Sequence, residues 1–398
     1  MQQKKFKIAY VATLFGHLEA FHIPYMNMLK ERGYEVHAYA NEDYGFDAIH
    51  THVECFKIPF KKNPIHPNNF KALKLLIEHF KREKYDMVHF HMPVASVIGR
   101  IAARIAKIPV VLYTAHGFHF CNGAPVKDWL LYYPVERFMA RWTDYLITIN
   151  QEDFKRAQKF KVRKKCLYIP GIGVDSTLIK NQDNKVLRTI KRKELGLKET
   201  DFVLFCAAEL RTLKNQRQMI ESIPKIKQFC PDIQCVLAGQ GDQQQEYEML
   251  AAALNVEQHI KFLGFRRDIP ELLACSDIVF LLSTREGLPK ALLEAMSASK
   301  PIIATNIRGN QDLVEDGKNG YIVELHDVAA TVSAVEDLYQ NPSLLEKMGE
   351  SSLRKVGQYD LQVILNEMEQ IYGNAIQEAF MHKGQLIKNE LNKGVVDS

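Results

Sequence analysis

The sequence of 398 residues has no apolar run long enough to cross a membrane as a helix. The longest candidate, residues 94–111, is interrupted by Arg100, Arg104 and Lys107, whereas a spanning helix needs roughly 20 predominantly apolar residues. The apolar stretch 8–15 is short and is followed by no small-residue cleavage site, so we expect a first strand there and no signal peptide. A cytoplasmic protein is expected.

Cysteine is scarce and scattered. The sequence has seven cysteines, an odd number, and none of them forms a C-x-x-C pair. Neither a disulfide framework nor a cysteine-based zinc site is indicated, which fits a reducing compartment.

Nucleotide-cofactor and nucleic-acid signatures are also missing. Gly239 and Gly241 lie in a Gly-Gln-Gly-Asp turn that lacks the third glycine of a dinucleotide fingerprint, which argues against NAD. No RNA- or DNA-binding motif is present, so we expect neither a cofactor nor a nucleic-acid partner.

Short apolar, β-rich runs alternate with helical patterns along most of the chain. This alternation is typical of doubly wound parallel sheets, and the length suggests two or three domains. Strands are expected at 6–13, 35–40, 52–56, 86–90, 109–114, 145–149, 166–169, 202–208, 233–238, 260–263, 278–282, 301–304 and 321–323.

Domain boundaries follow from changes in composition. We expect a first domain over 1–175, a polar linker with its lead-in helix over 176–200, a second domain over 201–358, and a helix with a polar tail over 359–398. In the first domain, Phe70, Leu73, Ile77 and Phe80 recur at helical spacing, which predicts a core-facing stripe.

The most informative stretch runs from residue 276 to residue 305. Two apolar strands flank a loop that reads Glu286-Gly287-Leu288-Pro289-Lys290 and a helix that carries Glu294. Ligands of open parallel sheets bind beyond the carboxyl ends of the strands, so this loop and helix start should face a ligand. The helix rises only about 7.5 Å from Pro289 to Glu294, so two carboxylates that accept hydroxyl hydrogen bonds could flank a helix N-terminus able to hold a phosphate.

This stretch resembles the E-x7-E motif of the retaining GT-B glycosyltransferases of family 4. Seven residues separate Glu286 from Glu294, Gly-Leu-Pro follows the first, and a Lys-Pro-Ile-Ile-Ala-Thr strand follows the helix. The resemblance implies a GT-B fold, an α/β architecture in which two Rossmann-like domains face a cleft. It also implies that Glu294 binds the ribose of a nucleotide sugar and that Glu286 orients its sugar.

Other donor-binding positions are carried over from the same resemblance. Lys214 matches the lysine that pairs with the donor diphosphate, and Pro289 opens the helix that would share this charge. The arginine position of the family pattern holds Glu209, so either Arg211 substitutes for it or the diphosphate relies on Lys214 and the helix terminus. Four further positions match donor-side segments of the family: Gly239, Gly241, Phe265 and Arg266.

Two positions in the first half complete the candidate site. Gly16 lies where the first strand meets the first helix, in an ordinary tight turn or in a turn that a ligand approaches closely. His116 ends a strand in Thr-Ala-His-Gly; alone it reads as a core histidine, but the family commonly places such a histidine beside the reacting sugar. Because no carboxylate or thiolate cluster joins His116 with His89, His91 and His119, no metal site is expected.

The resemblance implies transfer of a hexose or N-acetylhexosamine, with retention, from a nucleotide diphosphate such as UDP. The first residues resemble those of capsule and exopolysaccharide transferases, which implies an undecaprenyl-diphosphate-linked saccharide acceptor. Three alternatives remain: a non-catalytic sugar-nucleotide-binding subunit, an epimerase of similar fold, and a glycoside hydrolase.

Charge is distributed unevenly along the chain. Residues 1–175 carry 26 Lys and Arg against 16 Asp and Glu, a net charge of +10, and the remainder carries −5. Such asymmetry favours an anionic membrane surface as a partner of the first domain, so peripheral attachment to the inner face of the cell membrane is expected. Seven of these basic residues cluster around one helix and the loop before it: Lys61, Lys62, Lys71, Lys74, Lys81, Arg82 and Lys84.

Overall fold

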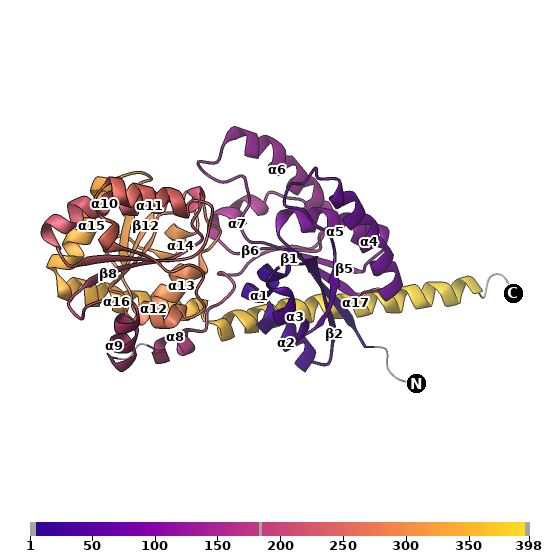
Figure 1. Ribbon diagram of the computed structural model, residues 1–398. Coiled ribbons are helices and arrows are strands. Elements are labelled where there is room, and N and C mark those ends of the chain that lie inside the picture. Colours follow the sequence, from indigo (N-terminus) through magenta and orange to yellow (C-terminus); the bar gives the residue numbers. More distant parts are fainter. Residues whose placement is uncertain (1–4, 183–184, 395–398) are drawn as a thin grey trace. The chain divides into compact units, whose positions relative to one another are not determined.

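The computed structural model describes residues 5–182 and 185–394, and the chain divides into two compact units (Figure 1). Unit 1 takes the residues up to Ile169 together with those from Ile364 onward, and unit 2 takes Pro170–Val363. Within the described residues, no helix combines the length and apolarity that crossing a bilayer requires.

Unit 1 is built on a parallel sheet of seven strands in the order β3-β2-β1-β4-β5-β6-β7. The strands are β1 (Lys7–Leu14), β2 (Glu35–Asn41), β3 (Glu54–Lys57), β4 (Met87–His91), β5 (Val110–Ala115), β6 (Tyr145–Thr148) and β7 (Lys165–Tyr168). Every residue of β4, β5 and β6 is buried, as expected for strands covered on both faces. The expected strands of this half are confirmed, with small shifts at their ends.

Helices cover both faces of this sheet. The helices of unit 1 are α1 (Phe15–Phe21), α2 (Ile23–Glu31), α3 (Phe46–His50), α4 (Asn68–Glu83), α5 (Pro93–Ile105), α6 (Val126–Met139), η1 (Ala140–Trp142), α7 (Gln151–Ala157) and α17 (Leu361–Gly394). One core joins the sheet to α1, α2 and α17, and a second joins it to α4 and α5 on the opposite face (Figure 1).

A buried hydrogen-bond chain fixes α17 to the middle of the sheet. The hydroxyl groups of Tyr10 on β1 and Tyr372 on α17 are hydrogen-bonded to each other. Tyr372 also contacts Nδ1 of His89 at 2.8 Å, and Nε2 of His89 contacts the hydroxyl of Thr114 at 2.8 Å. The last helix is therefore part of the core of unit 1.

Unit 2 contains a parallel sheet of six strands in the order β10-β9-β8-β11-β12-β13. The strands are β8 (Phe202–Ala207), β9 (Ile233–Ala238), β10 (Ile260–Phe262), β11 (Ile278–Leu281), β12 (Ile302–Thr305) and β13 (Gly320–Val323). Two doubly wound parallel-sheet domains, as predicted, are thus confirmed.

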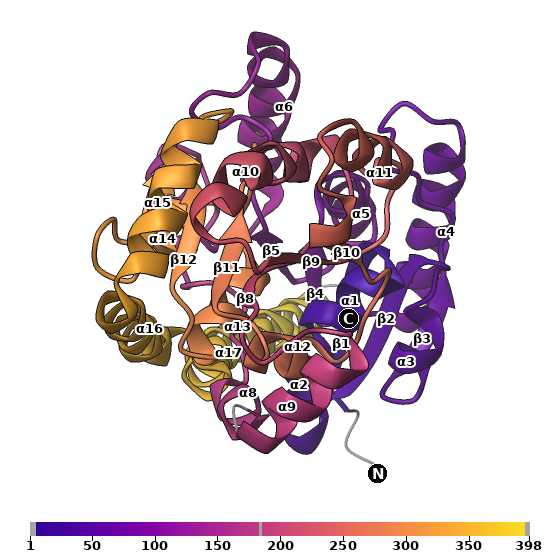
Figure 2. The ribbon, with the colours of Figure 1, turned by 60° about the vertical axis from the view of Figure 1, so that its left-hand side comes forward.

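The helices of unit 2 also lie on both sides of the sheet, with α10, α11 and α15 on one side and α12 and α13 on the other (Figure 2). They are α8 (Ser176–Gln182), α9 (Lys185–Glu194), η2 (Thr212–Lys214), α10 (Gln216–Phe229), α11 (Gln244–Ala253), η3 (Glu257–His259), α12 (Ile269–Ala274), α13 (Lys290–Ser297), α14 (Asn310–Leu313), α15 (Val328–Gln340), α16 (Pro342–Val356) and η4 (Gly357–Tyr359).

Two local expectations differ from the structure. The expected linker 176–200 contains α8 and α9, which pack against α12 inside unit 2. The predicted core stripe of α4 is wrong at Phe70, whose side chain is 75% exposed, because Ala72, Leu76 and Phe80 form the buried face of this helix. Helical spacing alone does not reveal which neighbouring row of a helix faces the core.

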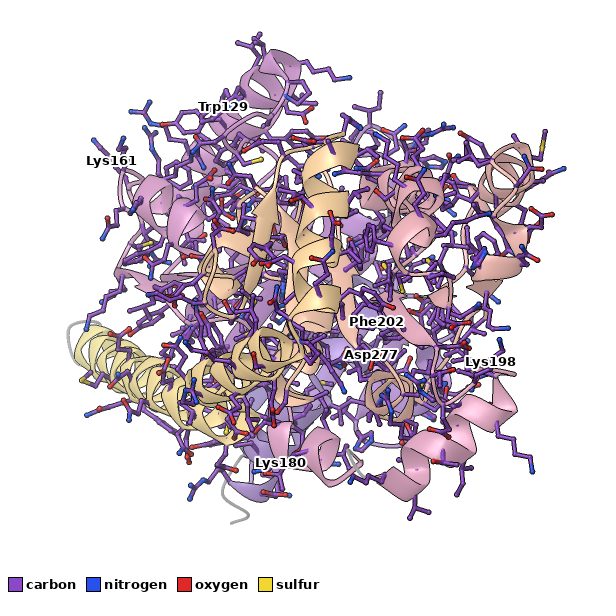
Figure 3. All side chains as sticks on the ribbon, turned by 90° about the vertical axis from the view of Figure 1, so that its left-hand side faces the viewer. Trp129, Lys161, Lys180, Lys198, Phe202 and Asp277 are labelled. Carbon is purple, nitrogen blue, oxygen red and sulfur yellow. The ribbon has the colours of Figure 1, made fainter. Side chains whose placement is uncertain are left out.

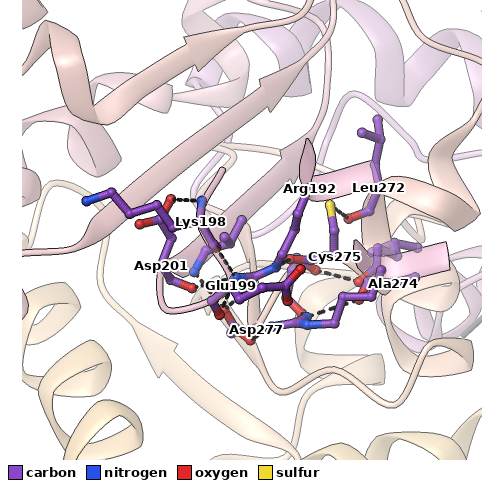
Figure 4. Close-up of polar contacts among 12 residues, drawn as sticks. Arg192, Lys198, Glu199, Asp201, Leu272, Ala274, Cys275 and Asp277 are labelled. Carbon is purple, nitrogen blue, oxygen red and sulfur yellow. Dashed lines mark hydrogen bonds and ion pairs between the residues drawn. The ribbon is translucent and has the colours of Figure 1, made fainter. Parts of the chain in front are cut away.

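Buried Arg192 fastens α9 to the sheet of unit 2 (Figure 4). Its guanidinium donates to the carbonyls of Lys198, Glu199, Asp201 and Cys275 at 2.8–3.2 Å. It also pairs at 3.1 Å with Asp277, which accepts a hydrogen bond from the backbone of β8 and is labelled beside Phe202 in Figure 3. A fully bonded guanidinium of this kind is expensive to remove.

We expect Arg192→Met to lower the free energy of unfolding by about 3–5 kcal/mol, because it breaks the buried ion pair with Asp277 and removes the donor to several carbonyls. Urea denaturation measures the change. Arg354→Met is the matched control, since Arg354 makes an exposed pair with Glu350 and should change stability by less than about 1 kcal/mol. Equal effects of the two substitutions would contradict a structural role for Arg192.

Candidate active site

Each sheet has one point where the strand order changes direction. In unit 2 this switch point lies between β8 and β11, and in unit 1 it lies between β1 and β4. Loops that leave the carboxyl ends of such strands diverge and leave room for a ligand. The side chains on the loops after β8, β11, β1 and β4 are therefore the first candidates for a site.

The switch point of unit 2 brings two predicted residues together. Nζ of Lys214, which ends η2 after β8, lies 2.6 Å from Oε1 of Glu286 in the loop after β11. The two loops also share a backbone hydrogen bond from Thr284 to the carbonyl of Leu213 at 2.8 Å. Glu286 is 12% exposed and Lys214 is 27% exposed, so the pair lies at the edge of solvent.

Helix α13 places Glu294 among buried neighbours. The helix begins at Lys290, one residue later than expected, and Pro289 is its extended N-cap. Leu293 and Ala295, on either side of Glu294 in the chain, are fully buried, and Lys290 lies 3.5 Å from the carboxylate. Burial raises the pKa of Glu294 above its ordinary value, although Lys290 opposes this shift.

The loop between Glu286 and α13 is tightly packed. Gly309 has a φ of +81°, and a Cβ there would lie 2.3 Å from the carbonyl oxygen of Gly287. Leu288 is buried, and a Cβ at Gly171, with a φ of +78°, would lie 2.7 Å from its side chain. The Gly-Leu-Pro segment is thus held on two sides by glycines that were not part of the predicted site.

Gly239 and Gly241 are packed closely against the backbone of the loop after β8. A Cβ at Gly239 would lie 1.9 Å from the carbonyl oxygen of Ala208, and one at Gly241 would lie 1.9 Å from that of Leu210. Close contact with the loop after β8 therefore accounts for both glycines without a ligand.

Three other predicted donor residues lie elsewhere on unit 2. Arg211 is 49% exposed and pairs with Glu209 at 3.2 Å. Phe265 is 55% exposed. Arg266 forms ion pairs with Asp268 and Glu194, and these carboxylates already occupy its guanidinium.

Gly16 and His116 belong to unit 1. Gly16 lies in the first turn of α1, where its amide donates to Asp43 at 2.8 Å and a Cβ would lie 2.7 Å from the Tyr44 ring. His116 directly follows β5, and its ring lies 4.6 Å from that of His17, the residue after Gly16. Burial lowers the pKa of His116 to about 4, so this imidazole is neutral near pH 7.

The switch point of unit 1 gathers four histidines. His17, His22, His91 and His116 each offer a ring nitrogen, and these nitrogens all lie within 4.8 Å of one another. Burial lowers the pKa values of His17, His22 and His91 well below the ordinary range. Nε2 of each of these three histidines is buried without a hydrogen-bond partner, which costs about 1–3 kcal/mol for each group.

Of the three histidines considered with His116 from the sequence, the structure places only His91 in the cluster. Both ring nitrogens of His89 are bonded, to Tyr372 and Thr114, and the ring of His119 stacks on Tyr132 at 4.3 Å. A usable signal was present, because His17, His91 and His116 lie at or just beyond the carboxyl ends of strands that are neighbours in the sheet. The sequence analysis did not give the order of those strands in the sheet, so it could not bring these histidines together.

Comparison with known protein families accounts for most of the chain. Residues 26–177 match Glycosyltransferase Family 4, and residues 188–355 match Glycosyl transferases group 1.

Individual relatives agree with this assignment. The chain is 39% identical to EpsD of Bacillus subtilis (strain 168), a protein assigned as a glycosyltransferase, over 92% of this chain and 96% of EpsD. It is 32% identical to the Escherichia coli UDP-Gal:alpha-D-GlcNAc-diphosphoundecaprenol alpha-1,3-galactosyltransferase, over 83% of this chain and 87% of that protein. Anabaena Alr3699/HepE, solved with UDP and glucose, is 21% identical and superposes with a TM-score of 0.80 over 93% of this chain and 100% of HepE. The chain therefore belongs to the GT-B glycosyltransferases, with a family 4 first half and a group 1 second half.

Proposed function

We propose that this glycosyltransferase moves a hexose or N-acetylhexosamine, with retention of configuration, from a UDP-sugar to an undecaprenyl-diphosphate-linked saccharide. The observation that carries the proposal is the Lys214–Glu286 pair at the switch point of unit 2, with Glu294 on the helix that follows. The Escherichia coli relative, named for a UDP-Gal donor and a GlcNAc-diphosphoundecaprenol acceptor, supports both substrate classes.

In the proposed donor complex, each charged group has a separate task. Glu294 accepts hydrogen bonds from the ribose hydroxyls, and Lys214 with the N-terminus of α13 holds the diphosphate. Glu286 orients the donor sugar, and Gly287, Leu288, Pro289 and Lys290 shape the loop that receives it.

The remaining proposed donor contacts are peripheral. Gly239, Gly241, Phe265 and Arg266 lie on the loops that would flank the nucleotide, with Gly16 in unit 1. Arg211 would supply a second cation after leaving Glu209, with which it forms an exposed ion pair.

The proposed catalysis rests on positioning and charge stabilisation and requires no metal ion or cofactor. As the bond between sugar and diphosphate breaks, negative charge grows on the diphosphate, where Lys214 stabilises it. His116 contacts the sugar near the reacting carbon. In a front-face transfer, the leaving diphosphate accepts the acceptor's proton, so no protein nucleophile is needed.

We further propose that unit 1 attaches the enzyme to the inner face of the membrane. Phe70 and Ile65 are 75% and 83% exposed, which is unusual for large apolar side chains. Four exposed lysines lie beside them in the chain: Lys61, Lys62, Lys71 and Lys74. Apolar groups that enter the headgroup region, surrounded by cations that meet anionic lipid, suit a peripheral membrane contact.

Release of UDP from a panel of sugar nucleotides, with one lipid-linked saccharide as acceptor, tests the function. We expect one UDP-hexose or UDP-N-acetylhexosamine to be consumed, and NMR of the product to show the anomeric configuration of the donor. Lys214→Ala and His116→Ala should lower kcat about 10²–10³-fold.

Exposed Lys225→Ala is the control for Lys214→Ala, and it should keep the original rate. Consumption of the donor without an acceptor product would indicate an epimerase or hydrolase, and binding without turnover would indicate a non-catalytic subunit.

Glu294→Gln should raise stability at pH 7 while weakening donor binding. The folded-state pKa of Glu294 is raised, so folding binds its proton more tightly and stability falls as pH rises from about 4.5 through the folded pKa. Removing the charge removes this penalty, and Tm should increase. Loss of a charged acceptor should cost about 1.5–3 kcal/mol in donor binding, roughly a 10- to 150-fold rise in donor KM.

The matched control is Glu350→Gln, because Glu350 also forms an i,i+4 pair but is exposed. This control should leave both Tm and donor KM nearly unchanged. An unaltered donor KM in Glu294→Gln would remove Glu294 from the donor site.

The double substitution Ile65→Ser and Phe70→Ser should reduce sedimentation with anionic liposomes at least about tenfold, and binding of the unaltered protein should fall as salt screens the lysines. Met249→Ser is a matched control in unit 2, where Met249 is 66% exposed.

Equal binding to neutral and anionic vesicles would contradict docking through this surface. A loss produced only by Leu130→Ser, on exposed α6, would assign the contact to that helix instead.

A further inference from the structure

The four histidines at the switch point of unit 1 come from three separate segments. His17 lies on α1, and His22 is the residue between α1 and α2. His91 ends β4, and His116 follows β5. Their nitrogens lie within 4.8 Å of one another, and Nδ1 of His91 lies 3.2 Å from Nε2 of His116. The fold, and not one local motif, therefore assembles this group.

The bonding of these imidazoles is incomplete in a way that points to a ligand. Nε2 of His17, of His22 and of His91 is buried and has no hydrogen-bond partner. Neighbouring His89 differs, because both of its nitrogens are bonded. Core histidines normally have partners of this kind, as buried polar groups do in general.

We propose that His17, His22, His91 and His116 bind one transition metal ion of the class that favours imidazole, with Zn²⁺ as the first candidate. Neutral imidazole nitrogen is a common zinc ligand, and zinc sites use four ligands at about 2.0–2.1 Å in tetrahedral geometry. Nitrogens in that arrangement lie about 3.3 Å apart. The nitrogens that the four residues offer lie within 4.8 Å of one another, so metal binding requires side-chain rotations that bring them to this spacing.

The composition of the group also selects among metals. It contains four imidazoles and no carboxylate, whereas Ca²⁺ and Mg²⁺ are bound through oxygen ligands. Zn²⁺, Ni²⁺, Co²⁺ and Cu²⁺ accept nitrogen ligands readily. Magnesium and calcium are therefore not expected to occupy this site.

Metal binding should inhibit sugar transfer. This expectation rests on the proposed function. His116 is the residue assigned there to the donor sugar, and as a metal ligand it is no longer free to contact that sugar. The metal-free enzyme should therefore be the active form, and bound zinc should inhibit it.

Direct binding measurements test the site without reference to activity. The full-length protein, dialysed against EDTA, is titrated with Zn²⁺ in competition with a chromogenic chelator, and Co²⁺ is used separately as a spectroscopic probe. We expect one equivalent of zinc and the visible absorption of tetrahedral cobalt. Loss of outer-shell partners alone costs metal sites about 10–100-fold in affinity, so His17→Gln and His22→Gln should each weaken zinc binding at least about 100-fold.

His50→Gln is the control, because His50 is exposed on the same unit. Circular dichroism and thermal unfolding establish that each variant is folded, and two separate ligand variants guard against the failure of one. Absence of stoichiometric binding, or zinc affinity that is equal in the control and both ligand variants, would overturn the site.

Activity separates this site from the proposed function. The ratio of transfer rates with and without one equivalent of zinc should fall well below one in the unaltered protein and return toward one in His22→Gln. If zinc binds at the four histidines and the rate is unchanged, the metal site stands and the role of His116 in transfer is wrong. If zinc does not bind while His116→Ala lowers kcat, the role of His116 stands and the metal site is wrong.

Discussion

A parallel sheet covered by helices on both faces has little room for polar side chains except where its strands end. In both units, strands at the centre of the sheet are buried along their whole length, so a ligand can be reached only at the carboxyl ends of the strands and in the loops beyond them. Reversal of the strand order at β1/β4 and at β8/β11 then determines which loops meet. The four-histidine group and the Lys214–Glu286 pair are the results of this one constraint.

The four-histidine group and the Lys214–Glu286 pair differ in their electrostatics. In unit 1 burial keeps the imidazoles neutral, and the Tyr10–Tyr372–His89 chain holds β1, β4 and α17 together beside them. Leaving three buried nitrogens without partners is unfavourable, and the surrounding core must be stable enough to tolerate this cost. In unit 2 the polar groups are instead paired, because Nζ of Lys214 lies 2.6 Å from Oε1 of Glu286.

The sequence was sufficient for the strands and for the family, because a continuous apolar run such as Ile278–Leu281 has few alternatives to a buried strand. The sequence was insufficient where contacts with distant parts of the chain determine which residues are buried. Phe70 fits a helical stripe, but the adjacent row that contains Leu76 is the one that the sheet covers. The segment expected as a linker with a lead-in helix belongs to unit 2, where Arg192 of α9 has a buried acceptor, Cys275, that is distant in the chain.

The candidate site shows the same limit. The spacing of Glu286 and Glu294 could be read directly, whereas the approach of Lys214 to Glu286 depends on β8 and β11 being neighbours. Gly239 and Gly241 were assigned to the donor site from the sequence, but their close contacts are with Ala208 and Leu210, which no local pattern reveals. His17 and His22 were missed because their partners lie after strands that are distant in sequence and adjacent in space.

Two charged side chains of unit 2, Arg192 and Glu294, differ in how many hydrogen bonds they make within the protein. This difference distinguishes a structural residue from one proposed to bind the donor. Arg192 is enclosed and makes five hydrogen bonds that Figure 4 shows within one network, so little in it remains to bind anything else. Glu294 is less enclosed, because 18% of its side chain is exposed; its carboxylate contacts a lysine on its own helix at 3.5 Å, and burial raises its pKa. A carboxylate kept charged in such surroundings is under-bonded in the free protein, and hydroxyl donors supplied by a ligand would remove that deficit. This imbalance is a second argument for the proposed ribose contact, beside the motif in which Glu294 occurs.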